Sequence, residues 1–164
     1  MDLITIASLS AVIIAQDAQP AKRSEAERIA RDYMAAYSQV DLERMQSFLA
    51  DDAVFEDRTA LGEGVGPDGL SYDNSASVME MLNQFRATYN PIELGFAWDT
   101  VFESNGRVIF SGHVNALYPT QDVTQNFRWR AEQVTVITVR DGHVVRHQDF
   151  ASYANPQREM VPAD

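Results

Sequence analysis

Two aspartates and a tyrosine are the residues of this chain best suited to acid/base chemistry. Tyr33 lies in a segment with helical spacing, Asp57 ends a short segment typical of a strand, and Asp149 lies in the last segment of strand character. A carboxylate can remove a proton from a carbon acid, and a phenol can donate a hydrogen bond to the oxygen that becomes negative. An apolar pocket raises a carboxyl pKa towards neutrality, which suits this task.

His113 is a fourth candidate catalytic residue, because strand register brings it towards the same place. Asn105-Gly106 favours a two-residue type I′ turn. Regular pairing from that turn sets Trp98 opposite His113 and Phe96 opposite Asn115, so that all four share one face. If that face is concave, His113 enters a cavity lined by Phe96 and Trp98.

The last hairpin is expected to present Asp149 to the same cavity. Asp141-Gly142 favours a second two-residue turn. The same register argument puts Asp149 and His147 on one face, opposite Val134 and Val136. A single histidine on a strand is more often a surface or core residue than a catalyst, so His147 is not included among the expected catalytic residues.

The sequence indicates neither a metal nor a cofactor. His113, His143 and His147 lack a metal-ligand spacing such as H-E-x-x-H. The absence of Cys excludes disulfides, thiolate metal sites and a cysteine nucleophile. The run 64–69 fits G-x-G-x-x-G, but it lies in a long glycine-rich loop outside any βαβ pattern and contains proline.

Composition describes one globular domain that does not bind nucleic acid. The 164 residues suffice for a substantial core, and 45% of them are hydrophobic. The formal net charge of −11 opposes binding to phosphate backbones, which needs a basic surface.

Residues 1–21 are expected to be a signal peptide. The apolar run 3–15 has the length of a signal-peptide core and precedes a stretch of small residues. Asp2 stands where a positive segment is usual, so an additional N-terminal helix and a misplaced start codon remain alternatives. Export predicts a periplasmic or secreted protein without a membrane anchor after processing, whereas an uncleaved segment predicts a cytoplasmic one.

The periodicity changes from helical to strand-like along the chain. Helices are expected behind a capping box at Ser24–Glu27, after a cap at Asp41, and behind a second capping box at Ser77–Glu80. A short strand is expected at 53–56 and a long loop at 58–74. Four strands are then expected at 94–102, 108–118, 127–140 and 143–152. This order predicts an α+β fold, with three N-terminal helices on a curved antiparallel sheet.

The run 33–57, YMAAYSQVDLERMQSFLADDAVFED, resembles the nuclear transport factor 2-like superfamily. The resemblance implies a cone-shaped, cystatin-like roll. Within the superfamily the run is most similar to ketosteroid isomerases, whose catalytic tyrosine and general base stand at Tyr33 and Asp57. The last strand, GHVVRHQDF at 142–150, resembles that of limonene epoxide hydrolases and SnoaL-type polyketide cyclases, in which an aspartate at Asp149 faces the pocket.

Two departures narrow the activities that the resemblance implies. Ketosteroid isomerases add a protonated aspartic acid on a late strand, but Val134-Thr135-Val136 carries no carboxylate and Glu132 is the nearest acid. Epoxide hydrolases use Arg-x-Asp where this chain has His113-Val114-Asn115. Polyketide cyclases need mainly one carboxylate in an apolar cavity, which Asp149 can supply.

The expected domain is therefore SnoaL-like and spans residues 22–155, followed by a tail at 156–164. Its expected function is isomerase, cyclase or lyase chemistry on a small hydrophobic carbonyl compound. The alternatives are a non-catalytic ligand-binding or dimerisation module and an interaction domain whose cone is filled. Superfamily resemblance also implies a homodimer through the sheet face. The expected substrate-binding residues are Tyr37, Phe55, Phe96, Trp98 and Asn115.

Overall fold

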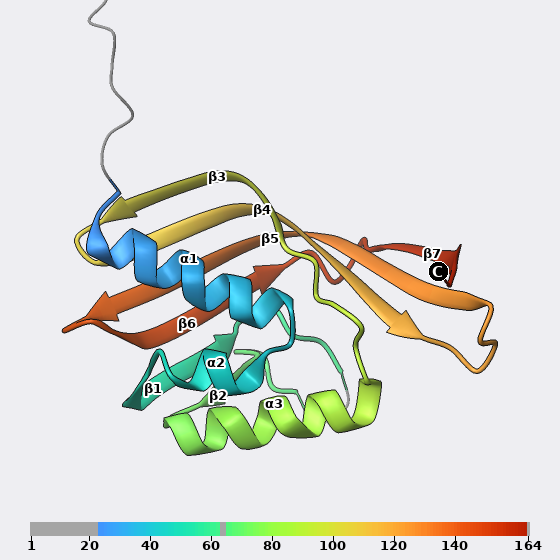
Figure 1. Cartoon of the computed structure of the whole chain (residues 1–164), viewed down its shortest axis with the longest axis horizontal. Coiled ribbons are helices and arrows are strands. Elements are labelled where there is room, and N and C mark those ends of the chain that lie inside the picture. Colours follow the sequence, from blue (N-terminus) through green and yellow to red (C-terminus); the bar gives the residue numbers. More distant parts are fainter. Residues whose placement is uncertain (1–22, 63–64, 164) are drawn as a thin grey trace, which may run out of the picture.

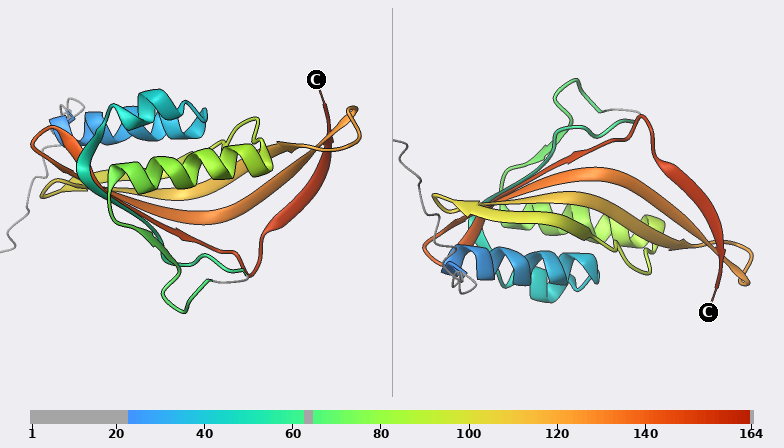
Figure 2. Two further views of the ribbon diagram at one scale, coloured as in Figure 1. Left: turned by 90° about the horizontal axis from the view of Figure 1, so that it is seen from below. Right: turned by 90° about the horizontal axis from the view of Figure 1, so that it is seen from above.

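Three helices lie on one side of a strongly curved sheet (Figures 1 and 2). The computed structural model describes residues 23–62 and 65–163. Its helices are α1 (Glu25–Ser38), α2 (Leu42–Gln46) and α3 (Ser75–Tyr89). Its strands are β1 (Leu49–Asp57), β2 (Leu70–Tyr72), β3 (Ala97–Ser104), β4 (Arg107–Pro119), β5 (Gln125–Arg140), β6 (His143–Ala151) and β7 (Gln157–Pro162).

The predicted signal peptide lies outside the described residues and stays a prediction. Among the helices that the structure describes, none combines the length and the hydropathy needed to cross a membrane.

Side-chain caps start all three helices. Ser24 accepts a hydrogen bond from the Glu27 amide at the start of α1, and Asp41 accepts one from the Arg44 amide at the start of α2. Both caps were predicted. The third helix starts two residues before the predicted box at Ser77, because Asn74 is its cap and forms a reciprocal capping box with Ser77.

The sheet confirms the predicted α+β cone, with one correction to its pairing. The strand order is β2-β1-β6-β5-β4-β3, and β7 pairs with β5. All neighbouring strands are antiparallel except β1 and β6, which run parallel. Two segments are more ordered than predicted, since β2 lies within the expected loop 58–74 and β7 lies within the expected tail.

Both predicted hairpin turns are present. Asn105-Gly106 joins β3 to β4 and Asp141-Gly142 joins β5 to β6, and all four residues have positive φ between 50° and 79°. This conformation belongs to the type I′ turn, which matches the twist of the strands that it joins. The hairpins β3–β4 and β5–β6 therefore follow directly from these two dipeptides.

Each of these two hairpins contains a β-bulge, in which one strand has an additional residue without a partner on the other strand. In β3 the register shifts between Trp98 and Thr100, which leaves Asp99 without a partner on β4. In β6 the register shifts between Val144 and Arg146, which leaves Val145 without a partner on β5. A one-residue shift turns the following side chains to the other face, and a bulge also bends the strand.

The main core lies between the helices and the concave face of the sheet. Its largest fully buried side chains include Tyr33, Met45, Phe110, Ile137 and His147. At 1% exposure His147 is a polar group within an otherwise apolar interior. Buried polar groups need hydrogen-bond partners, so its contacts are considered with the site.

We predict that Gly112→Ala destabilises the fold because the β3 bulge brings two backbones together at this residue. A Cβ on Gly112 would lie 2.1 Å from the Ala97 carbonyl oxygen. Overpacking of this kind typically costs about 1–3 kcal/mol. Urea unfolding measures the change, and Gly66→Ala is the control, since nothing lies within 4 Å of a Cβ there. Equal stability of the two variants would contradict the tight packing at the bulge.

Candidate active site

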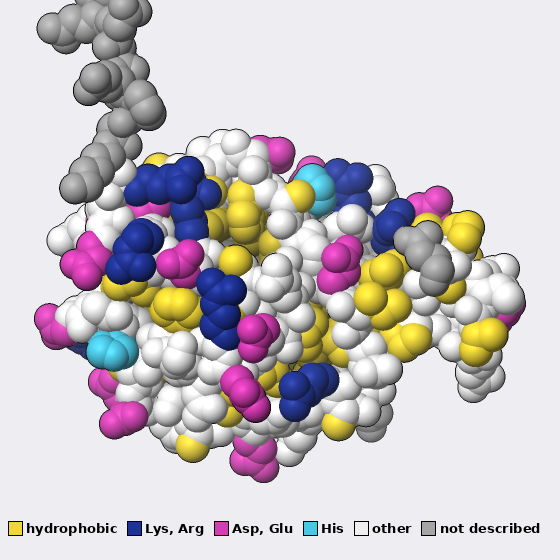
Figure 3. Space-filling model, viewed as in Figure 1, with side chains coloured by type: hydrophobic (Ala, Val, Ile, Leu, Met, Phe, Trp, Pro, Cys, Tyr) yellow, Lys and Arg dark blue, Asp and Glu magenta, His cyan; other side chains and the backbone are white. Residues whose placement is uncertain are grey.

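A cavity of about 850 Å³ opens on the concave face, between α3 and the outer part of the sheet. Hydrophobic side chains show in this region of the surface in Figure 3. The charged residues among its described lining are Asp57, Asp149 and Arg158. Many of the remaining lining residues are aromatic, namely Tyr37, Phe55, Tyr72, Phe85, Tyr89, Phe96, Tyr118, Phe127, Trp129 and Tyr153.

Asp149 is held by polar groups on one of its two carboxylate oxygens. Its Oδ1 accepts hydrogen bonds from Gln133 Nε2 at 2.8 Å and from Thr135 Oγ1 at 2.5 Å. The residue is 6% exposed and lines the cavity. Its Oδ2 makes no hydrogen bond to the described side chains, so this oxygen is available to a ligand.

Asp57 lies beside Asp149, because the two residues are register partners in the parallel pair β1–β6. Its Oδ2 accepts a hydrogen bond from the Tyr153 hydroxyl at 2.5 Å. Its Oδ1 accepts from the Thr59 amide at 3.2 Å. Both oxygens of Asp57 are thus occupied, unlike those of Asp149.

The environment of Asp57 favours its protonated form. Burial is the largest influence and raises the pKa of this carboxyl above its ordinary value of 3.8. The hydrogen bond from Tyr153 acts against this rise, the nearby negative charge of Asp149 adds to it, and the hydrogen bonds from Thr59 also oppose it. The pair therefore combines a carboxyl with a raised pKa and a neighbour with one uncommitted oxygen.

The phenols around the cavity are donors rather than bases. Burial and then the charge of Asp149 raise the pKa of both Tyr33 and Tyr37 well above 10.0. Burial, followed by the charge of Asp57, raises the pKa of Tyr153. Burial raises the pKa of Tyr118 to about 12. All four hydroxyls keep their protons at neutral pH.

Tyr33 lies behind the cavity rather than at its surface. The residue is fully buried and is not among the described cavity lining. Its hydroxyl lies 2.8 Å from His147 Nδ1, and His147 Nε2 lies 3.0 Å from Asp149 Oδ1. Direct contact between Tyr33 and a substrate oxygen, as expected from the sequence, does not fit this position. Tyr37 and Tyr153 are the phenols that reach the cavity near the carboxylates.

The expected placement of His113 and Asn115 in the cavity is wrong. Val114 and Ala116 line it, and because side chains alternate along a strand, His113 and Asn115 face the opposite, convex side. The Asp99 bulge is the cause, since it pairs Trp98 with Gly112 instead of His113.

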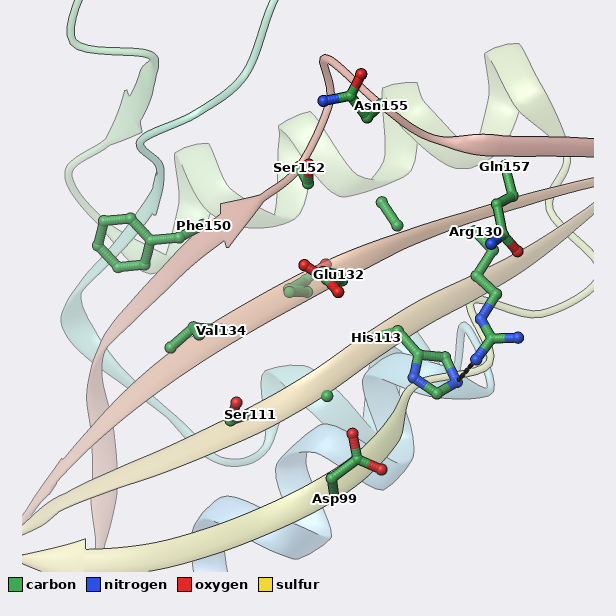
Figure 4. A pocket seen from close by; sticks show the side chains of 13 residues that line it. Asp99, Ser111, His113, Arg130, Glu132, Val134, Phe150, Ser152, Asn155 and Gln157 are labelled. Atoms are coloured by element: carbon green, nitrogen blue, oxygen red, sulfur yellow. Dashed lines mark hydrogen bonds between the residues drawn. The ribbon is translucent and has the colours of Figure 1, made fainter.

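His113 instead belongs to a second hollow, of about 1010 Å³, on the convex face. Figure 4 shows this face with the helices behind the sheet. There His113 Nε2 lies 2.9 Å from Arg130 Nη2, while Asp99 and Glu132 lie nearby. This hollow is separated from Asp57 and Asp149 by the sheet itself.

The other expected binding residues lie on the concave side. Tyr37, Phe55 and Phe96 line the cavity. Trp98 stacks on Phe96, with ring centroids 5.3 Å apart and planes 8° from parallel, but it packs into the core rather than lining the cavity.

Sequence reasoning missed four polar residues around the carboxylates: Thr135, Gln133, Tyr153 and Thr59. Asp149 and His147 share a face as predicted, but their partners on β5 are Thr135 and Ile137 instead of Val134 and Val136. The Val145 bulge produces this difference of one residue. Counting from the turn could not reveal it, because nothing in the sequence marks the bulge.

A model of the SnoaL-like domain family matches residues 30–147. The match spans most of the chain, which therefore belongs to the SnoaL-like family. This membership and the observed cone confirm the resemblance to the nuclear transport factor 2-like superfamily. A comparison with curated proteins gives no match.

Solved structures share the fold at low sequence identity. Two proteins provisionally named SnoaL-like polyketide cyclases, from Shewanella denitrificans OS-217 and Shewanella putrefaciens CN-32, give TM-scores of 0.67 and 0.69, each at 18% identity. The alignments cover 80% and 92% of this chain and 93% and 94% of theirs. An epoxide hydrolase of M. tuberculosis described as LEH-like gives 0.57 at 14% identity, covering 79% of this chain and 84% of its own. At these identities the likeness shows the fold alone.

We predict that Asp57→Asn makes the protein more stable than wild type by an amount that grows with pH. A raised pKa means that the folded state binds the proton more tightly than the unfolded state. Wild-type stability therefore falls as the pH rises from 3.8 through the folded-state pKa, whereas the variant lacks this loss. Urea unfolding across this pH range measures the difference.

Asp122→Asn is the control for this titration. Hydrogen bonds from Thr124 lower the pKa of the exposed Asp122 carboxyl, so its removal should change the pH dependence in the opposite direction. A stability difference for Asp57→Asn that stays flat or shrinks with pH would contradict the raised pKa.

Proposed function

We propose that this protein catalyses cofactor-free proton transfer next to the carbonyl group of a small hydrophobic compound. The main support for this proposal is the arrangement of Asp149. Its Oδ1 is fixed by Thr135 and Gln133, while Oδ2 has no hydrogen-bond partner among the described residues. A fixed carboxylate in an apolar cavity is suited to act as a general base.

The two carboxyl groups have different roles in the proposed reaction. Asp149 Oδ2 takes the proton from the carbon next to the carbonyl, and the C–H electron pair forms the carbon–carbon double bond of an enolate. Protonated Asp57 donates a hydrogen bond to the oxygen on which the negative charge collects. Its raised pKa supports this assignment, because the form that donates is the protonated one.

The fate of the enolate decides the overall reaction. Return of the proton to a different carbon gives an isomerisation, and attack of the enolate carbon on a second carbonyl gives a cyclisation. The family and the fold are compatible with both the isomerisation and the cyclisation. The large aromatic wall supports a hydrophobic substrate, since such surfaces exclude water and bury apolar groups.

We predict that Asp149→Asn lowers α-proton exchange by about 10²–10⁴-fold, the usual contribution of a positioned base. The probe is 2-tetralone, whose exchange with solvent deuterium is followed by proton NMR. Asp99→Asn is the control, because Asp99 lines the hollow on the convex face. Unchanged exchange in both Asp149→Asn and Asp57→Asn would exclude the proposed chemistry.

A binding module is the second candidate, favoured by the full occupancy of Asp57. Thr59, besides donating to Asp57, accepts a hydrogen bond from the Ala151 amide at 2.6 Å and so ties the loop after β1 to the end of β6. Such contacts also suit a purely structural carboxylate. Binding of 2-tetralone by the wild type, without exchange above the buffer rate, would favour this candidate.

The expected homodimer is supported by an apolar row on the convex face. Phe102, Val134 and Phe150 are 51%, 36% and 39% exposed, and they are neighbours through Ile109 and Val136 in the register of the sheet. Glu132 and Arg130 continue from Val134 along β5 on the same face, so a two-fold axis can set each arginine against the partner's carboxylate. The polarity and the charge pattern of this surface thus support a second copy as its occupant.

We predict that Val134→Glu converts a dimer into a monomer, because it places a charge in the centre of the apolar row. Light scattering coupled to size-exclusion chromatography gives the mass. Val123→Glu is the control, since Val123 is 87% exposed and lies in the turn between β4 and β5. A wild-type monomer, or a dimer that survives Val134→Glu, would contradict the interface.

A further inference from the structure

His147 is enclosed by aromatic rings and two polar groups. Phe55, Tyr37 and Tyr33 surround the imidazole with ring centroids 4.5, 5.3 and 5.5 Å away. The polar groups are the Tyr33 hydroxyl, 2.8 Å from Nδ1, and the Asp149 carboxylate, 3.0 Å from Nε2. At 1% exposure, with no place in the cavity lining, the imidazole has no direct access to a ligand in the cavity.

These two contacts assign the proton on the imidazole. A carboxylate oxygen is negatively charged and only accepts hydrogen bonds, so an unprotonated Nε2 at 3.0 Å would bring two electron-rich atoms together without a proton. Nε2 therefore carries the proton. The Nδ1 of a neutral imidazole is then an acceptor, and the Tyr33 hydroxyl must donate to it.

The Nε2 contact is close but oblique. Although Nε2 lies 3.0 Å from Asp149 Oδ1, its geometry does not make a hydrogen bond, and this buried nitrogen has no other partner in the described part of the chain. The attraction between the His147 N–H and the Asp149 carboxylate is thus electrostatic, without the alignment of a hydrogen bond. Thr135 and Gln133 hold the same oxygen from β5.

We propose that Tyr33 and His147 act together as a positioning pair for Asp149. The Asp149 carboxylate favours the Nε2–H tautomer, and the Tyr33 hydroxyl stabilises the same tautomer by donating to Nδ1. The N–H draws Oδ1 towards the core, which leaves Oδ2 towards the cavity. Neither residue touches the substrate. The catalytic consequence rests on the proposed role of Asp149 as base, whereas the tautomer itself does not depend on any activity.

The tautomer is tested by ¹⁵N NMR of the full-length protein labelled at histidine. The wild type should show His147 with a protonated Nε2 and an unprotonated Nδ1 at neutral pH. Tyr33→Phe removes only the hydroxyl and should give a mixture of tautomers. The signals of His113 and His143 serve as internal references and should not move, because neither residue contacts Tyr33. A wild-type His147 with a protonated Nδ1, singly or doubly protonated, would overturn the proposal, as would a tautomer unchanged by Tyr33→Phe.

The effect on Asp149 is tested with 2-tetralone exchange. Tyr33→Phe should lower kcat roughly fivefold, the factor that the net free energy of one hydrogen bond supplies, and leave KM unchanged. His147→Gln should lower kcat as well, and it serves as the second variant if Tyr33→Phe does not fold. Unchanged kcat in the variants of an active wild type would overturn the positioning role. A wild type without exchange would count against the proposed function, while the NMR result would still decide the tautomer.

Discussion

The parallel pairing of β1 with β6 is the constraint on which the candidate site depends. It places Asp57 and Asp149 side by side, and backbone contacts beyond the strand ends keep them there, with the Arg58 amide 3.0 Å from the Asp149 carbonyl oxygen. Parallel neighbours cannot be joined by a tight turn. The chain between them consequently builds β2, α3 and the rest of the meander before it returns, so the two carboxylates meet only when most of the cone is assembled.

The environment divides these adjacent carboxyl groups into unlike partners. Two negative charges on paired residues of neighbouring strands would repel each other in an apolar cavity. The two carboxyl groups have different neighbours. Asp57 has a phenol and a loop threonine, and burial raises its pKa. Asp149 has a hydroxyl, an amide and an imidazole around a single oxygen. Separate environments for two equivalent side chains are a common basis for pairing an acid with a base.

The fold was more predictable from the sequence than the site. Local signals such as Ser24, Asp41 and the two turn dipeptides determine helix starts and hairpins, because each acts within a few residues. The site depends on long-range register. Asp99 and Val145 each shift a strand by one residue, which moves His113 out of the cavity and sets Thr135 opposite Asp149. Tyr33 was correctly placed on a helix, but only the packing of α1 on β6 reveals that a histidine separates it from the cavity.

The last strand, β7, borders the cavity at a different part of the sheet from the two carboxylates. Arg158 belongs to β7, which pairs with the outer half of β5, whereas the carboxylates are fixed by the pairing of β1 with β6. Substitutions in β7 can therefore change the size and polarity of this side of the cavity, whereas Tyr153, before the strand, holds Asp57 through its hydroxyl. A different ligand can thus be accommodated at the C-terminal end of the sheet while Asp57 and Asp149 stay in place.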